Sequence, residues 1–531
     1  MHLKSLPHKP PGYMLAAILC SLGGFLFGID TGIIGPVTVM DDFKQYVGNP
    51  SPTIHGLVVS SILIPAAFSS FFAGRVADML GRPRGIAIGS FIFGVGAALE
   101  GASTHIAMFI VGRVVEGIGE GLYLSVLVVY ICEISPPRHR GALTTGPQLL
   151  TTLGLVTGFF TCYGTATITS SSSSPSMSWR LPFILLAAYS LAFSTAILIW
   201  LPPSPRWLTL RGRAGEAAAA WEKLDVPAAD REKILEQCET PAAVVAESTA
   251  GALPEASRVP SIGNVAAVAA ASLKEKKAKL LDVFASDARP QLLLAVFLMA
   301  MQQLSGIDGV LYYAPLLFSQ AGLSTTSSTF LASGVSAILI FSVTIPATLL
   351  ADRWGRRLNT ILGGLGMAAT MFLMGSLYAS GSVHGGEGAG RWVVIAAIYV
   401  FAALYCVTWA VGVKIYAAEI QPQRTRASAT SLAHAANWLA NFLVALVTPT
   451  LLATASYAAY FLFGGCAALT AGVCWLYMPE TRGLSLGEID DAFRERKKGG
   501  SGSGGGGWKG LVSTVVRRTV LRRRMPAAVE V

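Results

Sequence analysis

Two aspartates lie inside apolar segments of the sequence, and each follows the dipeptide Gly-Ile. The first is Asp30, in the stretch GGFLFGIDTGIIG at residues 23–35. The second is Asp308, in QQLSGIDGVLYY at residues 302–313. A carboxylate surrounded by lipid costs on the order of a few kcal/mol unless it is paired or faces water, so such a residue is functional by default. The two aspartates therefore point to the transfer of an ion or a solute across a membrane.

Arg113 is the natural partner of the first aspartate. Asp30 lies about 17 residues into its apolar segment, and Arg113 lies about nine residues from the outer end of another, near residue 105. At about 1.5 Å per residue their depths are compatible. Desolvation favours the neutral form of a carboxyl group and a nearby guanidinium favours the ionised form. A change in their separation would therefore convert conformation into proton affinity. The alternative is a static salt bridge between the two segments.

In the first, fourth, seventh and tenth apolar segments, near residues 12–36, 105–131, 290–318 and 392–417, the acids outnumber the bases. Four acids (Asp30, Glu116, Glu120 and Asp308) face two bases (Arg113 and Lys414). This excess indicates that at least one acid holds a proton. Glu116 is one helical turn from Arg113 and would compete for it, whereas the sequence assigns no role to Glu120.

The composition is that of a membrane protein with many spans. Of 531 residues, 53% are hydrophobic and 13% are charged, whereas soluble domains carry roughly 25% charged residues. A helix needs about 20 apolar residues to cross the hydrocarbon core. Twelve segments satisfy this, near residues 12–36, 53–74, 85–103, 105–131, 143–167, 180–201, 290–318, 328–350, 359–380, 392–417, 428–452 and 457–478. The expected fold is an all-α membrane protein with twelve transmembrane helices.

The formal charge of +10 is distributed unevenly between the loops. If the chain starts in the cytoplasm, the outer loops and their edges hold only Lys44, Arg180 and Arg391, and nearly all other basic residues fall on the inner side. This positive-inside pattern predicts that both termini are cytoplasmic. The basic charge therefore needs no nucleic-acid partner, and none is expected.

Related motifs occupy matching places in the two halves of the chain. AGRVADMLGRPRG at 73–85 is echoed by LLADRWGRRLN at 349–359, and CEISPPRHRGAL at 132–143 by AEIQPQRTRASA at 418–429. Parallel repeats of this kind indicate a duplication and are one known construction of transporters. The predicted organisation is a cytoplasmic N-terminus (1–11), a six-helix bundle (12–202), a cytoplasmic loop (203–288), a second six-helix bundle (289–478) and a cytoplasmic tail (479–531).

Two further segments have a simple physical interpretation. Gly24, Gly28 and Gly32 recur every four residues and predict a smooth helix face for close packing. The stretch at 508–524 is basic and follows a Gly/Ser-rich linker. It is predicted to be either a basic amphipathic helix on the inner leaflet or a solvated tail.

Several short motifs follow one another along the chain. GGFLFGID-TG lies in the first span, QQLSGID-x3-YY in the seventh and Asn437-Trp438 in the eleventh, and PETRG at 479–483 follows the twelfth. PPSPRWL at 202–208 follows the sixth span. With the repeated loop motifs, this order resembles the sugar-porter family of the major facilitator superfamily over about residues 12–493, although that family usually has PESPR after span 6. The resemblance implies an alternating-access carrier in which two six-helix bundles rock about a central sugar site.

The resemblance also implies where the functional residues lie. Proton-coupled members have an aspartate and an arginine at the positions of Asp30 and Arg113, and many facilitative members have a neutral residue at the first position. The sugar site would use amides, which donate and accept hydrogen bonds as sugar hydroxyls do. Its residues would be Phe27, Gln148, Gln302, Gln303, Asp308, Tyr312, Lys414, Asn437 and Trp438. Alternatively, Gln302 only joins helices and Trp438 only packs.

The sequence departs from the family pattern at this site. Asp308 stands where asparagine is usual, Lys414 replaces a tryptophan that stacks on the sugar, and Val411 replaces a proline. Because two opposite buried charges can compensate each other, we expect Asp308 and Lys414 to form an ion pair bordering the pocket. A lysine that Asp308 does not neutralise would instead favour a sugar acid or a quinate-like anion.

The repeated loop motifs imply an ionic gating network on the cytoplasmic side. Its expected members are Asp78, Arg82, Glu133, Arg140, Asp352, Arg356, Glu419 and Arg426. By the resemblance, they act as latches between spans that engage when the carrier opens outward and release when it opens inward. They are not expected to bind substrate.

The leading interpretation is a monomeric carrier of the plasma membrane that couples the uptake of a neutral mono- or disaccharide to protons. The alternatives are a facilitative carrier, a sugar-acid or polyol carrier, and a transporter-like nutrient sensor. The sequence contains no nucleophile–base constellation and no cluster of metal ligands. Neither an enzyme activity, nor a metal, nor any cofactor besides the coupling proton is therefore expected.

Overall fold

A computed structural model describes residues 10–48, 50–168, 177–227, 288–323, 326–350, 355–383, 388–422 and 426–482, together with the single residues 231, 284 and 493. Twelve helices in this part are long and apolar enough to cross a membrane. The expectation of an all-α fold with twelve spans is confirmed, and the chain is a multi-pass membrane protein. Most of the predicted central loop and of the predicted tail lies outside the described residues.

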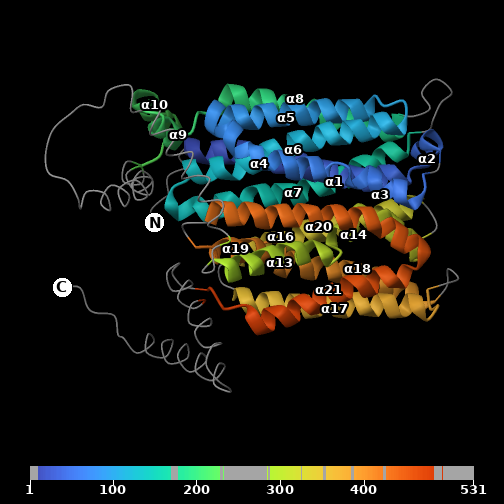
Figure 1. Cartoon of the computed structure of the whole chain (residues 1–531). Coiled ribbons are helices and arrows are strands. Elements are labelled where there is room, and N and C mark those ends of the chain that lie inside the picture. Colours follow the sequence, from blue (N-terminus) through green and yellow to red (C-terminus); the bar gives the residue numbers. More distant parts are fainter. Residues whose placement is uncertain are drawn as a thin grey trace, which may run out of the picture.

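The first six spans form the upper group of helices in Figure 1, coloured blue to green. They consist of α1 (Gly12–Val39), α3 and α4 (Pro52–Ser60 and Leu63–Leu80, which together make one span), α5 (Arg82–Gly101), α6 (Ile106–Ile134), α7 (Pro137–Ala166) and α8 (Met177–Trp200). The short helix α2 (Asp41–Val47) follows α1, and α9 (Pro205–Leu210) and α10 (Ala214–Leu224) follow α8. We call this group the N-bundle.

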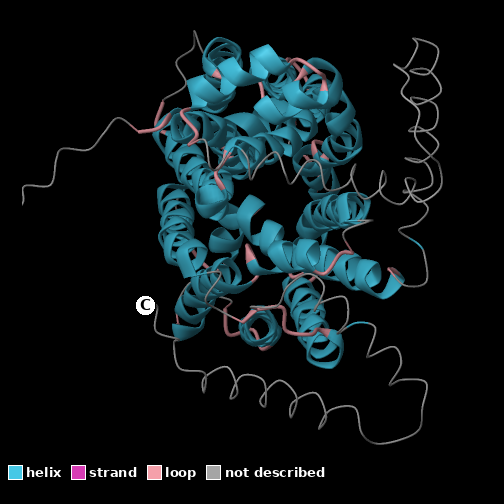
Figure 2. Cartoon of the chain, turned by 90° about the vertical axis from the view of Figure 1, so that its left-hand side faces the viewer, coloured by secondary structure: helices cyan, strands magenta, loops and turns pink. Residues whose placement is uncertain are grey.

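The last six spans form the lower group in Figure 1, the C-bundle, coloured yellow-green to red. They consist of α13 (Arg289–Leu304) with α14 (Ile307–Tyr312), α16 (Thr326–Leu350), α17 (Arg356–Ala379), α18 (Ala389–Thr408) with α19 (Gly412–Glu419), α20 (Arg426–Thr454) and α21 (Ser456–Tyr477). The short helix α15 (Ala314–Gln320) follows α14. Figure 2 views the same two groups nearly along the helix axes.

The two sides of the molecule are named here by the ends of α1, as the Gly12 side and the Val39 side. The bundles touch one another in the Val39-side half of their helices. A Cβ atom added at Gly35 of α1 would collide with the carbonyl of Tyr312 in α14, and one added at Gly56 of α3 would collide with the carbonyl of Leu446 in α20. The molecule is therefore closed between the bundles at the Val39 side.

The glycine face of α1 packs directly against α7. Added Cβ atoms at Gly24, Gly28 and Gly32 would meet the carbonyl oxygens of Pro147, Thr151 and Leu155, respectively. The prediction of a smooth packing face is confirmed. This contact fixes the depth of α1, and with it the position of Asp30.

Gly28→Ala is expected to lower the stability of the carrier by about 1–3 kcal/mol, because overpacking a tight contact forces the backbones apart. Gly465→Ala is the matched control, since a Cβ atom at Gly465 in α21 meets open space. Thermal unfolding of the purified protein in detergent measures the difference. Equal midpoints for the two variants would contradict this account of the α1–α7 contact.

Two spans of the C-bundle are interrupted, and the interruptions face each other. Span 7 breaks between α13 and α14 at Gly306, which has φ +88°, a left-handed conformation that costs glycine little. Span 10 breaks between α18 and α19 although it lacks the family's proline. Gln302 of α13 donates from Nε2 to the carbonyl of Trp409 at 2.8 Å, which joins the two breaks.

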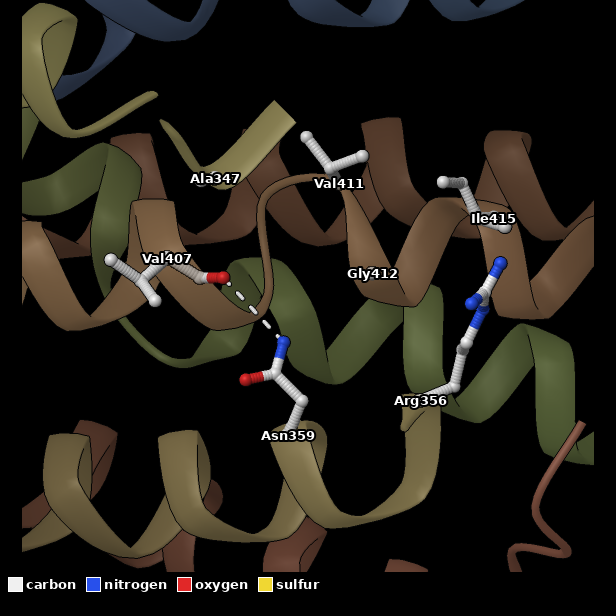
Figure 3. Close-up of a pocket in the computed structure, with 7 residues that line it drawn as sticks. All are labelled: Ala347, Arg356, Asn359, Val407, Val411, Gly412 and Ile415. Atoms are coloured by element: carbon white, nitrogen blue, oxygen red, sulfur yellow. Dashed lines mark hydrogen bonds between the residues drawn. The ribbon is translucent and has the colours of Figure 1, made fainter. Parts of the chain in front are cut away.

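Side chains from neighbouring helices satisfy the backbone groups that the break in span 10 exposes. Asn359 of α17 donates from Nδ2 to the carbonyls of Thr408 at 3.3 Å and Val407 at 3.5 Å. Figure 3 shows Asn359 beside this break, in a small pocket that Arg356 and Gly412 also line. Because freed carbonyls at membrane depth must find partners inside the protein, Gln302 and Asn359 explain why the helix can open here without proline.

Candidate functional site

Asp30 and Arg113 form a buried ion pair inside the N-bundle. Arg113 Nη1 donates to Asp30 Oδ1 at 2.6 Å, and the two side chains are 1% and 4% exposed for arginine and aspartate, respectively. Arg113 Nη2 also donates to the carbonyl of Val59 in α3 at 3.5 Å. The prediction that Asp30 and Arg113 lie close together is therefore confirmed.

The guanidinium of Arg113 lies within 4.0 Å of more than one carboxyl group. The same Nη1 atom donates to Glu116 Oε2 at 3.0 Å and lies 3.9 Å from Glu100 Oε2. Glu120 is fully buried on the same helix, and both of its carboxyl oxygens lack a hydrogen-bond partner. The charge at this site is thus shared among several carboxyl groups rather than balanced one to one.

Asp30 and Arg113 belong to the same bundle, which changes how they could separate. Rocking of two rigid bundles would leave their distance unchanged. The separation instead requires a shift of α1 relative to α6. Such a shift has a physical origin, because α1 contacts α14 of the C-bundle at Gly35, about 7.5 Å along the helix from Asp30.

The amides predicted for the sugar site form one connected group. Asn437 donates from Nδ2 to Gln302 Oε1 at 3.2 Å and to the carbonyl of Met299 at 2.7 Å, and Gln303 donates from Nε2 to Asn437 Oδ1 at 3.3 Å. Gln303 Oε1 is buried without a partner. Gln302 is fully buried and its amide joins two broken helices, so a structural role is established for it, while Gln303 and Asn437 retain hydrogen-bonding capacity.

Asp308 and Lys414 do not form the expected ion pair in this conformation. Each lies in the first turn after a helix break, Asp308 in α14 and Lys414 in α19. They interact electrostatically, but the described residues include no ion pair between them within 4.0 Å. Asp308 Oδ2 is buried without a partner, whereas Lys414 is exposed.

The other predicted sugar-site residues are buried to different degrees. Phe27 of α1, Gln148 of α7 and Trp438 of α20 are half-buried. Trp438 packs against a buried cluster that consists mostly of N-bundle residues and includes Tyr312 and Ala445 of the C-bundle. Tyr312 is 5% exposed and lies at the α1–α14 contact.

The ionic network on the Gly12 side holds each bundle together. Arg82 pairs with Glu133 at 3.0 Å and with Asp78 at 2.9 Å, all within the N-bundle. Arg356 pairs with Glu419 at 3.3 Å within the C-bundle. These pairs are formed in a structure that is closed at the Val39 side. Their expected release when the carrier opens inward stays a prediction.

The remaining network members are only partly described. Arg140 Nη2 donates to the carbonyl of Ser135 at 3.5 Å. Asp352 lies outside the described residues, and the side chain of Arg426 does as well. Glu480, which the sequence analysis did not select, accepts the backbone N–H groups of Arg356 and Arg357 at 2.8 and 3.2 Å.

Glu100 is the functional candidate that sequence reasoning missed. It is 0% exposed near the end of α5. The charge count covered spans 1, 4, 7 and 10 and left out span 3. A single acid inside the apolar run GAALEGAS was the signal that would have identified it.

Comparisons with known proteins agree with this architecture. The model of the sugar (and other) transporter family matches residues 16–493. The high glucose sensor RGT2 of Saccharomyces cerevisiae is 31% identical over 91% of this chain, which spans only 61% of that protein's length. The low-affinity glucose transporter HXT3 of the same yeast is 29% identical over 91% of this chain and 83% of its own.

The solved structures extend the agreement to the fold. The inward open conformation of the xylose transporter XylE from E. coli is 23% identical, covers 90% of this chain and 99% of its own, and superimposes with a TM-score of 0.70. The family match makes this chain a membrane carrier and not an enzyme. It covers both bundles, the Asp30–Arg113 pair and the amide group. The chain belongs to the sugar (and other) transporter family, the sugar porters of the major facilitator superfamily.

Proposed function

We propose that this chain is a secondary active carrier that imports a neutral mono- or disaccharide together with protons by alternating access. It would act as a monomer in the plasma membrane with the Gly12 side and both termini in the cytoplasm, and it would need no metal or cofactor. The buried Asp30–Arg113 pair is the observation that carries the proposal, because an acid that exchanges protons must be held between desolvation and a nearby cation.

The route from the sugar to the proton supports this proposal. Asp308 and Tyr312 lie one turn apart on α14, and the carbonyl of Tyr312 rests against Gly35 of α1. Sugar binding that shifts α14 would therefore press on α1 within a few residues of Asp30. The shift changes the distance from Asp30 to Arg113, and with it the affinity of Asp30 for a proton.

A sugar acid is the second candidate substrate, and Lys414 favours it. Lys414 is an exposed residue in a transmembrane span and has no ion pair or hydrogen bond among the described residues. A lysine that Asp308 does not fully neutralise would attract a carboxylate. The neutral sugar remains preferred because the amides of Gln303 and Asn437 suit hydroxyl groups.

Two further alternatives concern the mechanism rather than the site. A facilitative carrier would equilibrate its sugar without protons, and a nutrient sensor, as the name of the relative RGT2 suggests, would signal without moving much sugar. Uptake by the purified protein in liposomes separates all of these. Labelled hexoses, pentoses, sucrose, polyols and uronates are offered at two pH values, with and without an uncoupler. The proposal expects uptake of a neutral sugar that is faster at acidic pH and sensitive to the uncoupler.

Lys414→Met is expected to change the uptake of a neutral sugar by no more than about threefold, or roughly 0.7 kcal/mol, because Lys414 makes no bond to the amide group. Lys414→Arg is the matched control that keeps the charge. If the wild type instead transports a uronate, and Lys414→Met loses this uptake while Lys414→Arg keeps it, the sugar-acid candidate replaces the neutral one.

A further inference from the structure

A proton site made only of Asp30 and Arg113 has an electrostatic difficulty. When Asp30 takes up a proton, the guanidinium loses its counter-ion while it is 1% exposed. An uncompensated charge in the protein interior costs several kcal/mol, on the order of the penalty for breaking a buried ion pair. Proton uptake at Asp30 would then be strongly opposed.

Glu116 lies where it can act as a second counter-ion for Arg113 when Asp30 is protonated. Its Oε2 atom accepts from Arg113 Nη1 at 3.0 Å, and Asp30 accepts from the same nitrogen. Glu116 and Arg113 lie one turn apart on α6, so their contact persists when helices move past one another. Asp30 lies on α1 and can move away from both.

Glu100 provides an independent observation about the protonation of this group. Its carboxyl group is fully buried, and as a carboxylate neither of its oxygens has a hydrogen-bond donor. It lies within side-chain hydrogen-bonding reach of Glu116. Two carboxyl groups share a hydrogen bond only when one of them is protonated. A buried anion without donors is costly, and Arg113 Nη1 lies 3.0 Å from Glu116 Oε2 but 3.9 Å from Glu100 Oε2. The guanidinium therefore favours the negative charge on Glu116, so Glu100 is the neutral acid and donates to Glu116.

We propose that Glu116, held by a protonated Glu100, is the permanent counter-ion of Arg113 and thereby leaves Asp30 free to exchange the coupling proton. The proposal rests on the proposed function. Before proton uptake, the carboxylates of Asp30 and Glu116 share one guanidinium. An incoming proton forms an O–H bond on Asp30, and the group of four side chains goes from one net negative charge to neutrality. Arg113 stays paired with Glu116 throughout.

The charged and titratable groups around Glu116 come from three helices. Asp30 faces it from α1 and Glu100 from α5, while Arg113 and Tyr123 lie on its own helix, α6. Glu120, one turn further along α6, lies in the same group of acids but has no ion pair with Arg113 within 4.0 Å in the described part of the chain. Glu116 is thus a positioning residue that acts on Asp30 through Arg113.

The test is the pH dependence of D-glucose uptake in liposomes that contain the full chain. In Glu116→Gln, protonation of Asp30 leaves Arg113 unpaired, so the midpoint is expected to fall by about one pH unit or more, which is a tenfold higher proton concentration. Glu116→Asp is expected to restore most of the shift. Glu120→Gln is the comparison variant, because it removes an equally buried acid of the same helix that, among the residues described, makes no ion pair with Arg113. Its midpoint is expected to shift less than that of Glu116→Gln.

The outcomes separate this inference from the proposed function. Uptake by the wild type that does not depend on pH contradicts the proposed function. A pH-dependent wild type with the same midpoint in Glu116→Gln and Glu120→Gln overturns the inference. If Glu116→Gln does not fold, infrared spectra decide: the wild type is expected to show a buried carboxylic acid band at neutral pH that Glu100→Gln removes, and a wild type without that band overturns the inference.

Discussion

Arg113→Leu is expected to destabilise the carrier by roughly 3–5 kcal/mol, the cost of removing one partner from a buried ion pair. The substitution leaves Asp30 and Glu116 without the only cation within hydrogen-bonding distance of either in the described part of the chain. Thermal unfolding in detergent measures the loss, and sugar uptake in liposomes is expected to fall to background in the same variant.

Two further variants serve as controls for the stability loss in Arg113→Leu. Lys44→Leu breaks an exposed pair, with Lys44 Nζ 3.9 Å from Asp41 Oδ1, and is expected to cost less than about 1 kcal/mol. The double variant Asp30→Leu/Arg113→Leu removes one of the stranded acids and is expected to recover a large part of the lost stability without restoring coupled uptake. An Arg113→Leu protein as stable as Lys44→Leu would show that the buried group is not ionic.

The sequence predicted the features of the site that depend on one segment at a time. Periodic apolar runs of sufficient length located all twelve spans, and the depth of Asp30 and Arg113 in their spans predicted that they meet. The spacing of Gly24, Gly28 and Gly32 predicted a packing face, although not that its partner is α7. Each of these inferences uses only local composition and the helical rise.

The features that the sequence could not predict depend on residues far apart in the chain. The break in span 10 lacks its usual proline and is stabilised instead by Asn359 and Gln302, which lie on other helices. The prediction of an Asp308–Lys414 ion pair was wrong for a related reason. The distance between these two side chains is set by two half-helices, and no sequence pattern specifies it. The sequence also could not predict that the pairs of Arg82 and Arg356 each link helices of one bundle.

Asp30→Asn is expected to abolish accumulation of the sugar while keeping downhill transport. Asparagine resembles the protonated aspartate in shape and charge, so the carrier can still change conformation, but it can no longer bind or release a proton. A membrane potential of 100 mV supplies about 2.3 kcal/mol per proton, which corresponds to an accumulation of nearly fiftyfold in the wild type.

Counterflow exchange of labelled D-glucose against unlabelled D-glucose is the control for a folded and mobile carrier, and Asp30→Asn is expected to retain it. The decisive measurement is the steady-state ratio of internal to external sugar in energised liposomes. The account predicts a ratio well above one for the wild type and a ratio of one for Asp30→Asn. Accumulation by Asp30→Asn to the level of the wild type would contradict it.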